Sequence, residues 1–164
     1  RAGVTAQYAK ADRSPIAFRG PEADELFGQR WPDRHWMAFT SGRSGKREVY
    51  VRPFPQTDGE WTISLAGGQA PRWRGDGKEL FFEAADGKMM AVAVKVVPGA
   101  KSSFEAGAPM PLFDAHILHA NIDVNFEYDV TADGKRFLVN TTGAPGAASP
   151  PLTVVTNWTA GLDK

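Results

Sequence analysis

Four residues on predicted strands have the chemistry of a binding site, and they are Arg52, Arg72, Trp73 and Arg74. Each arginine lies beside aromatic residues in the sequence, and a guanidinium can stack on a ring or pair with a carboxylate. Such arginines either line a channel that receives a ligand or bond neighbouring parts of the fold to each other. We take these four residues as the ligand-binding candidates and keep the structural role as the alternative.

The tryptophans form a second set, Trp31, Trp36, Trp61, Trp73 and Trp158. An aromatic surface of this kind could hold a sugar or a peptide. Four of the five fall in strand patterns, however, and a tryptophan contributes a large buried area when strands pack. We therefore expect most of them in the core.

Two short motifs resemble reactive sites. Ser41–Gly45 (SGRSG) is similar to the nucleophile elbow of serine hydrolases, but it lies in a predicted hairpin loop with no helix after it, so we expect a plain turn. His116 and His119, with Asp114 and Asp123 nearby, could supply metal ligands, although two histidines in a loop are also common without a metal. We expect no catalytic residue, no metal ion and no cofactor.

Composition excludes several classes of partner. The chain has 164 residues, of which 42% are apolar and 23% charged, so it is long and apolar enough to form a packed core. Its 19 basic and 19 acidic side chains cancel, which leaves no field of one sign to attract nucleic acid. It has no cysteine, and no apolar run is long enough to cross a bilayer. We therefore expect neither nucleic-acid binding nor membrane insertion.

One hairpin pattern occurs three times. The copies are RWPDRHWMAF at 30–39, WRGDGKELFF at 73–82 and VTADGKRFLV at 130–139. An aspartate opens each turn, and a glycine follows it in the last two copies because the turn needs positive φ; in the first copy Arg34 replaces that glycine. We expect structural turn roles for five residues: Asp33, Asp76, Gly77, Asp133 and Gly134.

The spacing of these turns predicts the architecture. The turn aspartates are 43 and then 57 residues apart. The first interval is that of a four-stranded propeller blade of about 40–45 residues, and the second adds an insertion at about 98–125. We also expect a brief helical turn over Glu22–Phe27 and an edge strand at Pro109–Asp114, because proline cannot donate to a ladder.

The expected fold is all-β and consists of three propeller blades built on a four-stranded repeat, the last of which lacks its fourth strand. The expected divisions are a linker or tag remnant at 1–13, an isolated strand at 14–19, blades at about 28–68, 69–114 and 125–158, and a tail at 161–164. The partial propeller as a whole then covers residues 14–160.

Several phrases together resemble a known family. EVYVRPFP, APRWRGDGKELFF, KMMAV, YDVTADGKRFLVNT and SPPLTVVTNW are similar to the TolB-type (WD-like) β-propeller repeat, and more narrowly to the C-terminal propeller region of bacterial Ser/Thr protein kinases. The resemblance covers residues 14–160, and it departs at Arg34 and at the missing fourth strand of the last blade. It implies a binding or scaffolding surface without catalytic residues, and it favours a periplasmic or extracytoplasmic location.

The expected function is therefore a non-catalytic binding or scaffolding module from a larger bacterial protein. The alternatives are a propeller-based hydrolase or lyase with a site in the central channel, and an assembly fragment with no ligand of its own. Three blades cannot close a ring, and an open arc would expose apolar faces at both ends. We expect a homodimer that forms a six-bladed ring, in which Ser14–Arg19 pairs with Leu152–Trp158 of the second chain; a protein or peptide is the other expected partner.

Overall fold

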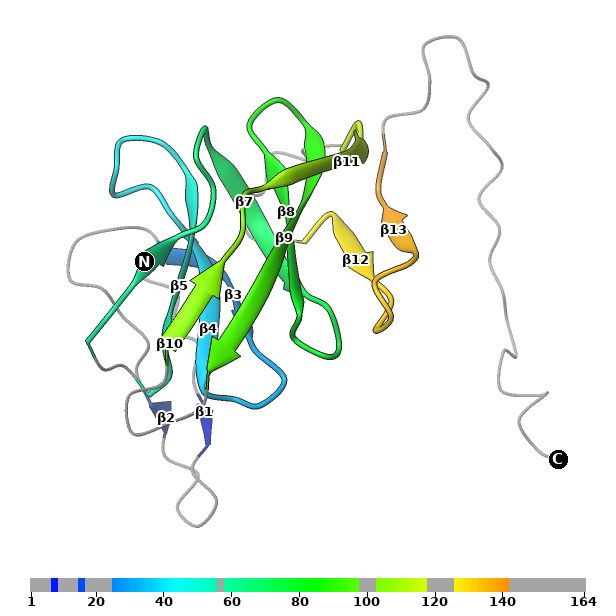
Figure 1. Cartoon of the computed structure of the whole chain (residues 1–164). Coiled ribbons are helices and arrows are strands. Elements are labelled where there is room, and N and C mark those ends of the chain that lie inside the picture. The colour runs from blue at the N-terminus through cyan, green and yellow to red at the C-terminus, as the bar shows by residue number, and fades with distance from the viewer. Residues whose placement is uncertain are drawn as a thin grey trace, which may run out of the picture.

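The computed structural model describes residues 7–8, 15–16, 25–55, 58–97, 103–117 and 126–141 (Figure 1). The described part is all-β, as expected, and forms several antiparallel sheets with no helix. The strands are β1 (Gln7–Tyr8), β2 (Pro15–Ile16), β3 (Glu25–Arg30), β4 (Trp36–Ser41), β5 (Glu48–Pro53), β6 (Trp61–Thr62), β7 (Gly68–Trp73), β8 (Glu79–Ala84), β9 (Lys88–Val97), β10 (Ser103–Ala106), β11 (Met110–Asp114), β12 (Tyr128–Val130) and β13 (Phe137–Val139).

The first sheet is a four-stranded meander in the order β3-β4-β5-β6. The helical turn expected over Glu22–Phe27 is wrong for its described part, because Glu25–Phe27 belong to strand β3. Phe27 has a φ of 55° and the register shifts between Leu26 and Gln29, so this strand carries a bulge. The bulge interrupts the two-residue alternation by which a strand is recognised in a sequence.

The second sheet has the order β7-β8-β9, and two short strands then share the outer edge of β9. Strand β10 pairs with the last residues of β9, whereas β11 pairs with its first residues. The sequence predicted β11 as an edge strand, which the pairing confirms, but it missed β10 inside the expected insertion. Pro111 lies at the edge, where a missing N–H costs the sheet no inner ladder bond.

The third unit is the β12–β13 hairpin, to which an isolated bridge between Ile117 and Thr141 is added. The rest of the third expected blade, including Leu152–Trp158, lies outside the described residues. Near the N-terminus, Pro15–Ile16 of the expected strand pairs with Gln7–Tyr8 in an antiparallel ladder.

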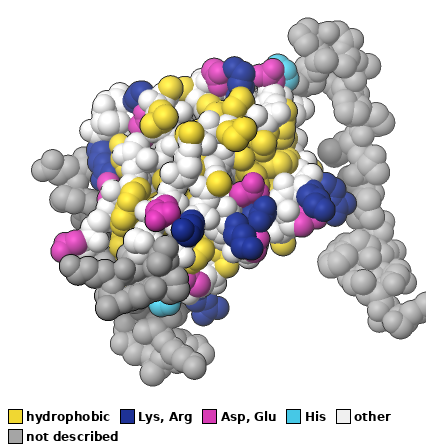
Figure 2. Space-filling model, viewed as in Figure 1, with side chains coloured by type: hydrophobic (Ala, Val, Ile, Leu, Met, Phe, Trp, Pro, Cys, Tyr) yellow, Lys and Arg dark blue, Asp and Glu magenta, His cyan; other side chains and the backbone are white. Residues whose placement is uncertain are grey.

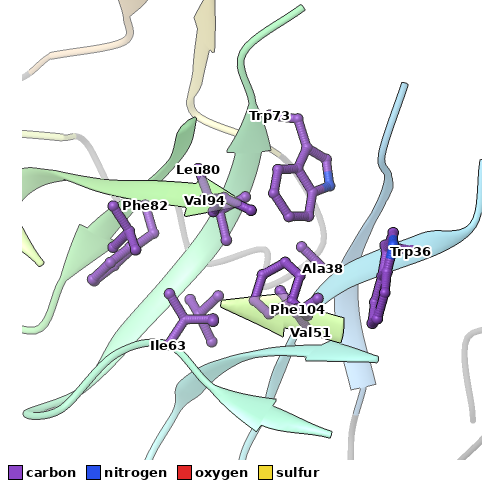
Figure 3. Close-up of a cluster of buried hydrophobic side chains, with 11 residues drawn as sticks. Trp36, Ala38, Val51, Ile63, Trp73, Leu80, Phe82, Val94 and Phe104 are labelled. Atoms are coloured by element: carbon purple, nitrogen blue, oxygen red, sulfur yellow. The ribbon is translucent and has the colours of Figure 1, made fainter. Parts of the chain in front are cut away.

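The main core lies between the first and second sheets. Alternate residues of β4 and β5 point toward β7, β8 and β9, and Phe104 of β10 closes the cluster (Figure 3). A second cluster joins the opposite face of the second sheet, through Phe81 and Met89, to Tyr128 of the third hairpin. Strands β8 and β9 are therefore packed on both faces, between the first sheet and the hairpin, whereas the edge strand β11 is exposed.

The outer face of the first sheet is also buried, contrary to the expectation of an exposed apolar end. Its aromatic residues Phe39, Tyr50 and Phe54 are each no more than 5% exposed. The guanidinium carbons of three arginines lie over these rings, at 4.5 Å (Arg52), 3.9 Å (Arg43) and 6.0 Å (Arg30) from the ring centroids. Cation–π stacking lets long charged side chains cover apolar rings.

The backbone repeats along with the sequence. The residue after each turn aspartate has positive φ, with values of 71° at Arg34 and 73° at both Gly77 and Gly134. Six residues before the aspartate, Phe27 and Ala70 have φ values of 55° and 53°. The first two units therefore share both the turn and the bulge, although the sequence shows only the turn.

Candidate binding surface

The three turn aspartates have equivalent hydrogen bonds. Oδ1 of Asp33, Asp76 and Asp133 accepts the backbone N–H of the residue two positions further along, at 2.8, 3.0 and 3.1 Å. This is the bond by which an aspartate side chain closes a turn on its own backbone. The three carboxylates thus act within their own hairpins.

Arg52 is committed to a buried ion pair. Its two terminal nitrogens donate to Glu25 at 3.1 and 2.9 Å, and the two side chains are 3% and 9% exposed. Since the guanidinium also lies over Phe39, it joins β5 to β3 on the outer face of the first sheet. Its contacts are those of a structural residue.

Trp73 lies in the main core and is 8% exposed. Its indole N–H donates to the Gln29 carbonyl at 3.1 Å, which ties β7 to β3. Trp36 is also buried, and Trp31 and Trp61 pack against the same cluster, whereas Trp158 lies outside the described residues. The described tryptophans thus serve as packing residues.

Arg74 belongs to the turn that follows it. It donates to Asp76 at 2.7 and 2.6 Å and to Glu79 at 2.6 Å. These bonds raise the pKa of Arg74 and hold the pKa of the Asp76 carboxyl far below its usual range. The hydrogen bond from Arg74 is the largest cause for Asp76, and the Lys78 backbone N–H is the next.

A pH experiment tests this turn. Because the pKa of Asp76 is lowered on folding, its contribution to stability is present above its ordinary pKa of 3.8 and is lost as the pH falls through the lowered value. We expect Asp76→Asn to lower the melting temperature at pH 7 and to differ progressively less from the wild type below about pH 4. Asp58→Asn is the control, since Asp58 is exposed and its carboxylate forms no hydrogen bond or ion pair with another described residue. A difference at Asp76 that stays constant with pH would contradict the assignment.

Of the four candidates, Arg72 lines an open cavity formed by described residues. Its guanidinium carbon lies 3.7 Å from the centroid of the Phe126 ring, and a terminal nitrogen donates to the Tyr128 carbonyl at 3.4 Å. The nearest carboxylate is that of Asp129, 3.7 Å from Nε. This side chain therefore links β7 to β12 while remaining partly exposed.

The cavity is an open hollow of about 540 Å³ on the third hairpin. Alternate residues of β12 and β13 and their neighbours face it, and one of these, Leu138, is 78% exposed. Its lining is Arg72, Phe126, Glu127, Tyr128, Asp129, Leu138, Val139 and Asn140. The lining combines one cation, two carboxylates and an amide with four apolar or aromatic side chains, a mixture that can contact both the backbone and the side chains of a polypeptide.

A second cavity of about 270 Å³ lies where loops of the first and second sheets meet. Its polar side chains are bonded to each other, since Arg47 donates to Gln69 at 3.0 Å and Gln69 donates to Glu83 at 3.0 Å. The lining is Lys46, Arg47, Ala66, Gly67, Gly68, Gln69, Glu83, Ala84 and Ala85. These bonds hold β7 and β8 against the first sheet.

The buried Glu48 beside this cavity is a structural carboxylate. It accepts the Ser64 hydroxyl, the Gly67 N–H at 3.1 Å and the Lys46 ammonium at 3.0 Å. Ser64 in turn accepts the Val49 N–H at 2.8 Å. The group closes the loop between β6 and β7 and has the full set of partners that a buried carboxylate requires.

The two motifs that resembled reactive sites lie in turns or loops. Ser41–Gly45 leads from β4 into the β4–β5 turn, where the Gly45 N–H donates to the Gly42 carbonyl at 3.0 Å. His116 follows β11 with a φ of 46°, and His119 and Asp123 lie outside the described residues. Within the described ranges, no group of three or more potential metal ligands gathers. No helix there is long and apolar enough to cross a membrane.

Sequence reasoning named Arg72 but missed its neighbours in the hollow, Phe126, Glu127 and Asn140. The sequence does indicate that Arg72 meets the third repeat, because Arg72 and Asp129 both stand four residues before a turn aspartate and have opposite charges. Equivalent positions of consecutive repeats lie side by side when the repeats stack. Comparison with protein-family models and with curated proteins found no match to this chain.

Proposed function

We propose that this chain is a non-catalytic binding or scaffolding module built from propeller-type blades of the TolB-like kind. The proposal is supported by what the chemically capable side chains do. Arg52, Arg74 and Trp73 are engaged in contacts within or between the sheets, and Glu48 and Glu83 have hydrogen-bonded partners. Among the described residues, an exposed protein surface is the feature that supports a binding function.

The observation that carries the proposal is the open outer face of the β12–β13 hairpin. The opposite face of this hairpin packs on the second sheet, and the inner strands of the first and second sheets belong to buried hydrophobic clusters on both of their faces. The outer face presents Glu127, Asp129, Leu138 and Asn140, with Leu138 78% exposed at its centre. Figure 2 shows apolar side chains gathering on the viewed face between β11 and this hairpin. Exposed apolar groups within a polar rim are typical of a protein–protein interface.

We propose that the first partner is a second copy of the chain, in a homodimer that closes a six-bladed ring. The outer face of the β12–β13 hairpin is open at one end of the chain's series of sheets, and a two-fold axis would bring this end of each copy onto the first-sheet end of the other copy. In this arrangement Ser14–Arg19 pairs with Leu152–Trp158 of the other chain. The net charge of zero adds no general repulsion between the copies.

Light scattering over a range of concentrations tests the dimer. We expect a mass twice the 17.8 kDa of the chain. Leu138→Lys should weaken association by about tenfold or more, because it replaces an apolar contact with an ammonium that must lose hydration on burial. Leu65→Lys is the matched control, since Leu65 is 77% exposed and lies in the β6–β7 loop, away from the hairpin.

Deletion of residues 1–20 tests the strand exchange separately, and we expect it to weaken the dimer. A monomeric wild type at micromolar concentration would contradict the dimer. An unchanged dimer after the deletion would contradict the strand exchange alone.

A further inference from the structure

Neighbouring repeats contact each other through equivalent turn positions. The Trp31 indole N–H donates to the Gly77 carbonyl at 2.8 Å, and a Cβ on Gly77 would lie 1.9 Å from that nitrogen. In the next pair, a Cβ on Gly134 would lie 2.8 Å from Cδ of Arg74. In both cases the large residue stands two positions before the turn aspartate of its own repeat. The glycine stands one position after the turn aspartate of the following repeat. Each repeat therefore places a large side chain on the turn glycine of the following repeat.

Two further contacts follow the same order along the chain. The Gly75 N–H donates to the Ala132 carbonyl at 2.9 Å, and both residues stand one position before their turn aspartates. The Trp73 indole N–H donates to the Gln29 carbonyl at 3.1 Å. Trp73 stands three positions before the turn aspartate of its own repeat, and Gln29 stands four positions before that of the preceding repeat. These contacts define how one repeat docks on the next.

The two ends of the series differ from this pattern in opposite ways. The last repeat has the small Thr131 where the earlier repeats have Trp31 and Arg74, and the first repeat has Arg34 where the later ones have glycine. Arg34 keeps the positive φ of that position, at 71°, which an arginine adopts only at a cost. At the two ends of the series, a small residue (Thr131) therefore stands at the position of the large one, and a large residue (Arg34) stands at the position of the glycine.

The backbone groups at the ends are complementary as well. The Ala132 N–H has no bond within the described residues, and it is the equivalent of the Gly75 donor. Pro32 is the equivalent of the Ala132 acceptor, and it can accept a hydrogen bond although it cannot donate one. The third turn therefore offers a donor where the first turn offers only an acceptor.

We propose that the third turn of one copy, Thr131–Gly134, contacts the first turn, Pro32–Arg34, of a second copy. The equivalent positions meet as they do between consecutive repeats of one chain, and we call this arrangement the docking register. Arg34 then fills the space left by Thr131, and the Ala132 N–H donates to the Pro32 carbonyl. This inference rests on the homodimer proposed above and names the surface that closes it.

Charge favours the same partner. Arg30 and Arg34 form no ion pair within the described residues. In the docking register Arg30 is the equivalent of Trp73, so it faces Asp129 of the third repeat, whose carboxylate is 66% exposed. The third hairpin also presents Glu127. Opposite charges at matched positions select this pairing and fix its orientation.

Variants that exchange the large and small residues at positions 131 and 34 test this docking arrangement, with the dimer Kd measured by analytical ultracentrifugation. Thr131→Trp places an indole against Arg34 of the second copy, so we expect the dimer Kd to rise at least about tenfold. Adding Arg34→Gly recreates the Trp31–Gly77 pair, and the Kd of the double variant should return to within about threefold of that of Arg34→Gly alone. Thr131→Val is the control, because it removes the hydroxyl that bonds Asp133 and Arg136 without adding bulk.

The outcomes separate the two proposals. A dimeric wild type whose Kd is unchanged by Thr131→Trp overturns this register and leaves the homodimer standing. A loss of dimer that Thr131→Val reproduces, or that Arg34→Gly does not rescue, also overturns the register. A monomeric wild type overturns both proposals. Circular dichroism of each variant confirms that its sheets are formed before its Kd is compared.

Discussion

Replacing Gly77 with valine is expected to destabilise the protein by roughly 3–5 kcal/mol. Gly77 has a φ of 73°, where a β-branched residue is strained, and its Cβ would lie 1.9 Å from the Trp31 indole nitrogen. Trp31 packs against Trp73 of the main core, with ring centroids 6.3 Å apart, so it cannot move aside without disturbing that cluster. Urea denaturation of the wild type and the variant would measure the loss, which is a large share of a domain's total stability.

Gly87→Val separates the backbone cost from the packing cost. Gly87 has a similar φ of 82°, but a Cβ built there meets nothing within 4 Å. We expect this variant to lose only about 1–2 kcal/mol, the cost of the left-handed conformation. Equal losses at the two positions would mean that the contact with Trp31 contributes nothing, and the packing argument would then fail.

Replacing Arg52 with methionine is expected to cost about 3–5 kcal/mol, because it leaves a buried carboxylate without its partner. The Glu25 side chain is 9% exposed and receives two hydrogen bonds from the guanidinium. Lys95→Met is the control. The pair of Lys95 with Glu105 is 72% and 61% exposed, and its loss should change stability by no more than about 0.5 kcal/mol.

Adding Glu25→Leu to Arg52→Met should recover most of the lost stability, since a buried ion pair can be replaced by apolar residues at little net cost. Denaturant midpoints of the two single variants and the double variant form a cycle that isolates the coupling. If the double variant were as unstable as the sum of the single variants, Arg52 would stabilise the sheet through its stacking on Phe39 and not through Glu25.

The turns and most strands could be predicted from the sequence because short-range chemistry decides them. An aspartate bonds its own backbone two residues on, and the residue after it takes positive φ, so Asp76 and Gly77 indicate a hairpin whatever surrounds them. The three matching hairpins also made the repeat visible. Strand β10 and the bulge at Phe27 escaped because neither leaves a regular alternation in the sequence.

The roles of Arg52 and Arg72 could not be predicted, because each depends on a residue distant in the sequence. Arg52 and Arg72 both lie on strands beside aromatics, yet one meets Glu25 on a buried sheet face and the other reaches an open hollow beside Phe126. The strand order of the first sheet brings Arg52 to Glu25, and the packing of the third hairpin on the second sheet brings Arg72 to Phe126.

By itself, the sequence determined an all-β chain of repeated hairpins, since φ preferences and side-chain-to-backbone bonds act over a few residues. The tertiary structure decided which surfaces remain open. It placed three arginines over the buried aromatic residues of the first sheet's outer face, and it left Leu138 of the third hairpin exposed. The physical reason is that the burial of a side chain depends on which strands pack against its face of the sheet. Those strands are distant in the sequence, so a local sequence pattern does not identify them.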